Sequence, residues 1–314
     1  MPLNDAHFCE FSFLLSVKIM NKYVKIPATI EKQINNLKER GLIINDVSTV
    51  EHFLSHNNYF RLRAYTYPFQ NKERKFTVQI TFTDILDLYN FDSKLRSLIF
   101  SALEKIEISL RTQITYNFSL EVGKDFYLYP KHFSNVLQFF KMLDSIIKEE
   151  NRSKDKFVGE HLKAYSDFFM PIWKATEIMS FGNLSIMFKN LKDDKIKTTI
   201  TQNYGLYDVD ILENWLRGFT VLRNICCHHS RLWNRTLSKI KIPKKPKYQF
   251  TSISNNNSNK IYSYFCCTVY LLKIIKPDNT FKTDLTELMK TCPLNQSKNM
   301  GFPVDWQDDE FWKK

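Results

Sequence analysis

The feature that most constrains the fold is a long apolar stripe in residues 83–118. Its members recur every three or four positions, at Leu88, Phe91, Leu95, Leu98, Ala102 and Ile106. An α-helix places such positions on one face, so the pattern predicts a long amphipathic helix, either continuous or kinked into two. Glu104, Glu107 and Arg111 share another face, and Glu107 and Arg111 have the i,i+4 spacing of a solvated surface ion pair.

The rest of the chain is also patterned as a helical protein. Its 314 residues contain only 7 glycines and 10 prolines, fewer turn residues than many short strands would need. We therefore predict an all-α fold. Further helices are expected at 28–46 (closed by Gly41), at 48–56, within 133–166 around a solvated polar loop at 148–156, at 170–191 with a break at 180–183, at 209–235, at 261–275 and near 281–290.

Length and uniform composition favour a single domain. There is no internal repeat and no change of composition along the chain, so we expect one helical domain over residues 20–312. Its bundle core would span about residues 83–275, with N-terminal and C-terminal helical extensions. Residues 1–19 are interpreted as a leader or a misassigned translation start, because the short apolar run at 8–20 lacks the cleavage site of a signal peptide.

The charge balance indicates an anionic partner. A net charge of +12 and a pI near 9.2 favour nucleic acid or an anionic membrane surface, although a protein can be basic without either. Residues 57–70 interleave aromatic rings with Arg61 and Arg63, a pattern that suits base stacking but suits core packing around a turn at Pro68 better. The basic loop 239–247 is compatible with phosphate contacts or with a solvated linker.

Cysteine usage indicates a reducing compartment. Four of the six cysteines form the adjacent pairs Cys226–Cys227 and Cys266–Cys267, which point about 100° apart on a helix and do not suit a disulfide framework. We interpret them as reduced thiols of a cytoplasmic protein. The apolar run 263–275 is too short to span a membrane and is expected to be a buried helix.

The most distinctive stretch is VLRNICCHHSRLWNR, residues 221–235. We place residues 209–231 on one helix, with Arg223 on a shoulder and His229 near the apolar edge, where a hydrogen-bonded structural histidine is expected. The apolar stripe of this helix is expected at Trp215, Phe219, Leu222 and Cys226, and the polar face at Arg217, Asn224, His228 and Arg231.

Three chemistries compete for this stretch. A zinc site is disfavoured because Cys226 to His229 would fan around the helix instead of converging, and a cysteine nucleophile is disfavoured because Cys226 would face the core. RNA cleavage needs only a proton-transferring group and a cation, since ribose supplies its own 2′-hydroxyl nucleophile. Arg223 and His228 lie about 140° apart around a helix, which suits two facing copies better than one.

Residues 223–228, RNICCH, resemble the R-(N/H)-x-x-x-H signature of HEPN ribonucleases, and the wider context resembles the bacterial Abi (abortive infection, phage resistance) family within that group. The resemblance covers roughly residues 20–312 in the family's order. It rests on NNYFRLRAYTYPF (57–69), LYNFDSKLRSLIFSALEKIEISLRT (88–112), PIWKATEIMSFGNLS (171–185), LRNICCHHSRLWNR (222–235) and MGFPVDWQDDEFW (300–312).

The resemblance implies a HEPN-like helical bundle that cleaves RNA in phage defence or as a toxin. Two motifs would pair across a homodimer cleft without a metal or other cofactor, leaving a 2′,3′-cyclic phosphate. Arg223 would stabilise the phosphate, His228 would transfer the proton, and Asn224 would position the phosphate or the imidazole. Auxiliary or RNA-binding roles would fall to His229, Arg231, Arg217 and Arg235, and Glu104, Glu107 and Arg111 would belong to a supporting helix.

Two other functions stay open. One is a non-catalytic RNA-binding or protein-binding HEPN module in which Arg223 and His228 serve docking. The intact Arg and His favour the enzyme over this module. Binding to an anionic membrane is a weaker alternative. The expected partners are an RNA substrate, a second copy of the chain and an antitoxin that is either RNA or protein.

Overall fold

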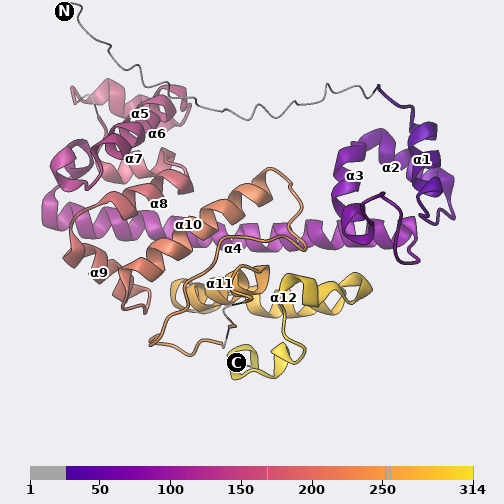
Figure 1. Cartoon of the computed structure of the whole chain (residues 1–314). Helices are drawn as coiled ribbons and strands as arrows, with labels where there is room; N and C mark the ends of the chain where they lie inside the picture. Colours follow the sequence, from indigo (N-terminus) through magenta and orange to yellow (C-terminus); the bar gives the residue numbers. More distant parts are fainter. Residues whose placement is uncertain (1–25, 168, 252, 255, 314) are drawn as a thin grey trace, which may run out of the picture.

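The structure is a computed structural model that describes residues 26–313 except 168, 252 and 255 (Figure 1). The described residues contain helices and isolated β-bridges but no strand, which confirms the predicted all-α fold. The predicted leader, residues 1–19, lies outside them. The helices are α1 (Ile30–Glu39), α2 (Val47–His56), α3 (Tyr59–Thr66), α4 (Phe82–Val122), α5 (Val136–Arg152), α6 (Lys156–Ala164), α7 (Ile172–Ile178), α8 (Phe181–Asn190), α9 (Asp194–Asn203), α10 (Val209–Cys227), α11 (Ile261–Ile275), α12 (Phe281–Lys290) and α13 (Glu310–Lys313).

Helix α4 is the axis of the molecule. Its 41 residues form one unbroken helix, about 60 Å long, so the apolar stripe corresponds to one helix and not to two. A capping box between Thr81 and Asp84 begins the helix, and Gly123 ends it at a positive φ of 113°. In Figure 1, α1–α3 lie at one end of α4, α5–α9 gather at the other, and α10 crosses the middle.

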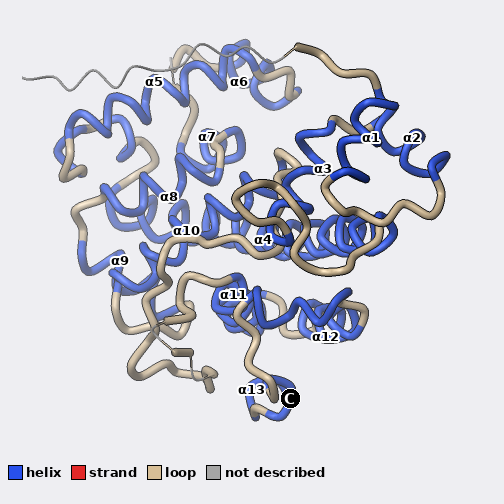
Figure 2. Tube along the Cα trace, turned by 45° about the vertical axis from the view of Figure 1, so that its right-hand side comes forward, coloured by secondary structure: helices blue, strands red, loops and turns tan. Residues whose placement is uncertain are grey.

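The hydrophobic core runs along α4. Buried side chains form a contiguous cluster that extends from Ile34 in α1 to Trp312 in α13. Helix α11 is buried from Ile261 to Leu272 and packs on α4, as the apolar run predicts. Figure 2 shows α11 and α12 side by side beneath α4. The C-terminal segment closes over α11, where the Trp312 indole Nε1 donates to the Tyr262 hydroxyl at 3.0 Å.

Two predicted loops are largely helical. The polar run 148–156 was expected to be a solvated loop, but α5 continues to Arg152 and α6 begins at Lys156, so only residues 153–155 connect them. Lys148 and Arg152 occupy exposed helix positions, where Lys148 pairs with Asp144 one turn away, whereas Glu150 is buried. The predicted break at 180–183 is confined to Met179 and Ser180, because the Ser180 hydroxyl accepts the Asn183 N–H and starts α8 at Phe181.

Candidate nucleic-acid interface

Helix α10 ends at Cys227, earlier than the predicted residue 235. His228 is the C-cap, and His229 has a left-handed φ of 52°. The Ser230 N–H donates to the Ile225 carbonyl and the His229 N–H to the Cys226 carbonyl, both at 3.0 Å, which is the bonding of a Schellman motif. Histidine occupies the position that glycine usually marks, so the sequence carries no strong stop signal. The prediction that His229 lies on the helix beside the core is wrong, since its side chain is exposed.

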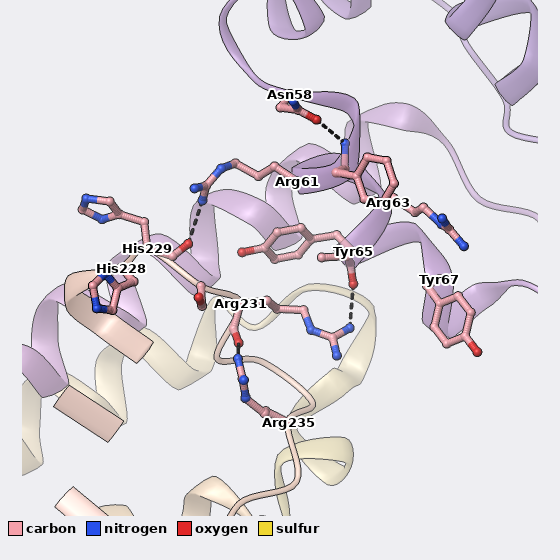
Figure 3. A pocket seen from close by; sticks show the side chains of 12 residues that line it. Asn58, Arg61, Arg63, Tyr65, Tyr67, His228, His229, Arg231 and Arg235 are labelled. Carbon is pink, nitrogen blue, oxygen red and sulfur yellow. Dashed lines mark hydrogen bonds between the residues drawn. The ribbon is translucent and has the colours of Figure 1, made fainter. Parts of the chain in front are cut away.

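The segment that follows α10, residues 228–235, is held against α3 and α4 by hydrogen bonds. The Arg61 guanidinium donates to the His229 carbonyl at 2.6 Å, and the Arg231 guanidinium donates to the Ala64 carbonyl at 2.6 Å (Figure 3). The backbone N–H groups of residues 232 and 233 donate to the Asp92 carboxylate at 3.2 and 2.6 Å. Residues 228–235 have no regular secondary structure, and these contacts fix their position. As a result, the turn at His228 and His229 lies beside α3.

Asp92 is the centre of a buried polar network. Its carboxylate has no exposed surface, pairs with Arg96 one turn along α4, and accepts the Tyr65 hydroxyl at 2.6 Å. Burial raises the pKa of Asp92, whereas Arg96 and the donated hydrogen bonds oppose that shift. Burial and the adjacent carboxylate together raise the pKa of Tyr65 far above its ordinary value, so the phenol stays protonated and donates. The network joins α3, α4 and the post-helix segment.

An open cleft of about 950 Å³ lies between α3 and residues 228–235. Figure 3 shows His228 and His229 at one end of it and Arg63 and Tyr67 at the other. Its lining contains four arginines and two histidines but no Asp or Glu. The lining residues are Asn58, Phe60, Arg61, Arg63, Ala64, Tyr65, Tyr67, His228, His229, Ser230, Arg231 and Arg235.

The arginines of this cleft have no carboxylate partner among the described residues, and two of its aromatic rings are exposed. None of its four arginines lies within 4.0 Å of a carboxylate in the part of the chain that the structure describes. Phe60 and Tyr67 are 66% and 62% exposed, so their faces can stack on planar groups. The Arg231 guanidinium is half-buried over the Trp233 ring at 5.5 Å, and desolvation lowers its pKa. The cleft is thus suited to phosphates and bases.

Arg223 lies outside this cleft. Its Nε atom is 4.0 Å from Glu107 Oε2 on α4, and its guanidinium stands 6.0 Å from the centre of the Phe100 ring. Asn224 and Arg217 are exposed on α10 and do not line the cleft either. Within one chain, therefore, the structure does not bring Arg223 and Asn224 into the cavity that His228 lines.

The predicted surface ion pair on α4, between Glu107 and Arg111, is not a solvated one. Glu107 is buried, not solvated, and its Oε1 accepts from Arg111 at 2.7 Å. Arg111 also donates to the Met179 carbonyl at 3.0 Å, so the pair ties α4 to the end of α7. Burial raises the pKa of Glu107, and Arg111 and Arg223 oppose the shift. Glu104 is exposed and has no contact with the cleft.

A family comparison covers both walls of the cleft. The model of the Abi-like protein family matches residues 52–234, more than half of the chain, and this span includes α3, α4, α10 and nearly all of residues 228–235. The chain belongs to the Abi-like family. Membership suggests a role in abortive infection, a form of phage defence. No curated protein and no solved structure matches the chain.

The sequence predicts the side of the cleft that residues 228–235 form, but it assigns the other side, α3, mainly to core packing. His228, His229, Arg231 and Arg235 line the cleft. Residues 57–70 were assigned mainly to core packing, which holds for Tyr65 but not for Phe60 or Tyr67. The stretch divides because α3 turns one face to the core and the other to the cleft.

The buried anchor Asp92 was missed. The signal for it is a carboxylate placed next to Phe91 on the apolar side of α4, with an arginine four positions later. Asp and Arg are almost never fully buried unless they are paired. A charged i,i+4 pair on an otherwise apolar face therefore indicates a buried ion pair more than a surface one.

The environment of the cysteines on α10 bears on the alternative chemistries considered for this stretch. Cys226 is buried, and burial raises the pKa of its thiol to about 12, which disfavours the thiolate that a nucleophile needs. Cys227 is half-buried on the shoulder of α10. No cluster of three or more His, Cys, Asp or Glu side chains in the described residues is arranged to hold a metal ion. No described helix is long and apolar enough to cross a membrane.

Proposed function

We propose that this chain is a metal-independent endoribonuclease of phage defence, with RNA bound in the cleft and His228 transferring protons. The observation that carries the proposal is the pairing of two exposed imidazoles with four arginines that have no carboxylate partner among the described residues. Histidine is the side chain that most readily exchanges protons near neutral pH. Arginine is the side chain best suited to bind phosphate through two parallel hydrogen bonds.

The proposed reaction uses the nucleophile that RNA carries. The ribose 2′-oxygen forms a bond to phosphorus and loses its proton to a base, while the bond from phosphorus to the 5′-oxygen breaks and that oxygen takes a proton from an acid. The products are a 2′,3′-cyclic phosphate and a 5′-hydroxyl. His228 serves as one of these two groups. Arg61, Arg231 and Arg235 are placed along the cleft to offset the negative charge that develops on the phosphate.

Arg223 joins this reaction only in a homodimer. Because it lies outside the cleft of its own chain, a second copy must bring it to the bound phosphate, as in the HEPN enzymes that the RNICCH motif resembles. The α4 surface beside Arg223 has apolar groups for such a contact. Phe100, whose ring Arg223 approaches, is 38% exposed, and Ile108 two turns further along α4 is 51% exposed.

The direct test is RNA cleavage by the purified chain in EDTA, followed by mapping of the new 3′ ends. We expect fragments with 2′,3′-cyclic phosphates, and none from the Arg223→Ala/His228→Ala double variant purified in parallel. Cleavage by both proteins would assign the activity to a contaminant or another site. Activity that chelation abolishes and Mg²⁺ restores would contradict the metal-independent mechanism.

A second candidate function is RNA binding without cleavage, in phage defence by sequestration. The observation that favours it is the same arginine-rich, aromatic lining, which suffices for binding. His228→Ala separates the two functions: an enzyme loses cleavage and keeps affinity, whereas a binding module has no cleavage to lose.

A further inference from the structure

A second hollow lies between α1 and α3. It has a volume of about 530 Å³ and shares Phe60 and Arg63 with the cleft, so the two cavities adjoin at these side chains. We call it the flanking pocket. It is lined by Ile26, Pro27, Ala28, Lys32, Gln33, Asn36, Arg40, Tyr59, Phe60, Arg63 and Arg74.

The flanking pocket carries the same kind of charge as the cleft. Lys32, Arg40, Arg63 and Arg74 line it, whereas no Asp or Glu does. None of these cations forms an ion pair within 4.0 Å in the described part of the chain. The two cavities therefore form one basic track across α3, and a track of one sign attracts a chain of opposite charge.

One of these cations is held in place before any ligand binds. The Arg40 guanidinium donates to the Tyr59 hydroxyl at 2.8 Å, which aligns it along the pocket wall. At Arg74 the backbone is fixed, in a tight turn with a left-handed φ of 64° where its N–H donates to the Asn71 carbonyl at 3.0 Å. A guanidinium held as that of Arg40 is loses less conformational entropy when it binds a phosphate.

A stacking platform stands where the two cavities meet. The Phe60 ring is 66% exposed, and the Arg63 guanidinium lies 5.6 Å from its centre. The Phe60 N–H donates to the Asn58 carboxamide at 2.8 Å, which caps α3 and fixes the start of the helix (Figure 3). Aromatic rings between cations suit a strand with unpaired bases, because each base offers a flat face and each phosphate a charge.

We propose that the flanking pocket binds single-stranded RNA on one side of the cleaved bond, with Phe60 stacking on a base at the junction. The proposal rests on RNA as the ligand of the cleft, and it adds a subsite that makes binding depend on RNA length. A short oligonucleotide fills the cleft alone, and a longer one continues over α3 to Lys32, Arg40 and Arg74.

The test measures affinity in EDTA with the His228→Ala chain, so no cleavage intervenes. Oligouridylates from two to about ten nucleotides are compared, in the range of single-strand site sizes. Lys32→Ala/Arg74→Asn removes two cations, and asparagine tolerates the left-handed backbone at position 74. The matched control is Lys154→Ala/Lys163→Ala, which removes two exposed lysines near α6.

We expect Lys32→Ala/Arg74→Asn to weaken the binding of long RNA only. The slope of log K against log salt concentration should become shallower by about 1.4 for that RNA. Phe60→Ala should weaken that binding by about fivefold or more. An effect equal to that of the control, or equal for all lengths, would overturn the proposal, as would competition by a polyglutamate peptide as strong as that by RNA. Because only binding is measured, a chain that cleaves no RNA still answers this question.

Discussion

The two ends of the RNICCH motif lie in contrasting surroundings. Arg223 is 34% exposed, faces the buried carboxylate of Glu107 and covers an apolar ring on α4. His228, five residues later, is exposed in a cleft whose lining has four arginines and no carboxylate. The difference arises because α10 stops at Cys227, so the chain leaves the helix direction and turns toward α3. Residues that are close in the motif therefore belong to different surfaces of one chain.

This contrast has an electrostatic consequence. The charge of Arg223 is partly balanced by Glu107, which Arg111 also contacts, whereas the cleft arginines have no carboxylate within 4.0 Å among the described residues. We infer that the cleft supplies the affinity for RNA. Arg223 would then contribute only when a second copy of the chain is present. The predictions below test this division of roles, beginning with the largest expected effect.

Asp92→Ala should remove the support of the cleft. The substitution leaves Arg96 buried without its carboxylate and frees the backbone of residues 232 and 233, and breaking a buried pair costs about 3–5 kcal/mol. Chemical denaturation should show a loss of this size, with RNA binding lost in parallel. Asp87→Ala, at an exposed position on the same helix, is the control and should change stability by less than about 0.5 kcal/mol. Equal stability of the two variants would contradict the anchoring role.

A mixing experiment tests whether Arg223 and His228 act in different chains. Arg223→Ala and His228→Ala should each be inactive alone. If the site is composite, each heterodimer of the two variants has one site with both intact residues. Random exchange makes about half of the dimers heterodimers, so cleavage should return to about a quarter of the wild-type rate. No recovery after verified subunit exchange would show that the two residues act within one chain or that the chain does not work as a dimer.

Arg235→Ala and Arg223→Ala should differ in RNA binding. Arg235 is exposed in the cleft, so its removal should weaken binding and reduce the salt dependence of log K by about 0.7. Arg223→Ala should leave the affinity of the monomer within roughly twofold, since its charge is partly balanced by Glu107. RNA titrations at several salt concentrations measure the affinity and its salt dependence for both variants. A larger loss of affinity for Arg223→Ala than for Arg235→Ala would contradict the proposed division of roles.

His229→Gly should have the smallest effect. Glycine adopts the left-handed φ of this position without strain, so the imidazole is removed while the turn after α10 is kept, and stability should change by at most about 1 kcal/mol. If His228 is the main proton-transferring group, cleavage should fall by less than about tenfold. A loss as large as that of His228→Ala would assign His229 an equal part in the chemistry.

Much of the fold could be predicted from periodic patterns. The stripe in α4 and the apolar run of α11 are long enough for side-chain periodicity to determine both structure and burial. The end of α10 could not be predicted in this way, because His229 forms a turn that glycine usually makes. The local sequence continues a helical pattern, and tertiary contacts to Arg61 and Asp92 hold a different conformation.

The candidate site was harder to predict than the fold. His228 and Arg235 were named from the motif, but the second wall comes from α3, about 170 positions earlier in the chain. Aromatic and arginine residues in one stretch suit both a core and a ligand surface, and only the direction of each side chain distinguishes them. Tyr65 points to Asp92, whereas Phe60 and Tyr67 remain exposed.

The most direct measurement compares cleavage rate and RNA affinity for the wild type and His228→Ala in EDTA. Loss of a general acid or base should lower the cleavage rate by about 10²–10⁴-fold, while the dissociation constant for RNA stays within roughly twofold because the cleft arginines remain. An unchanged cleavage rate, or a fall in affinity as large as the fall in rate, would contradict the account of His228 as the proton-transferring group of an RNA-binding cleft.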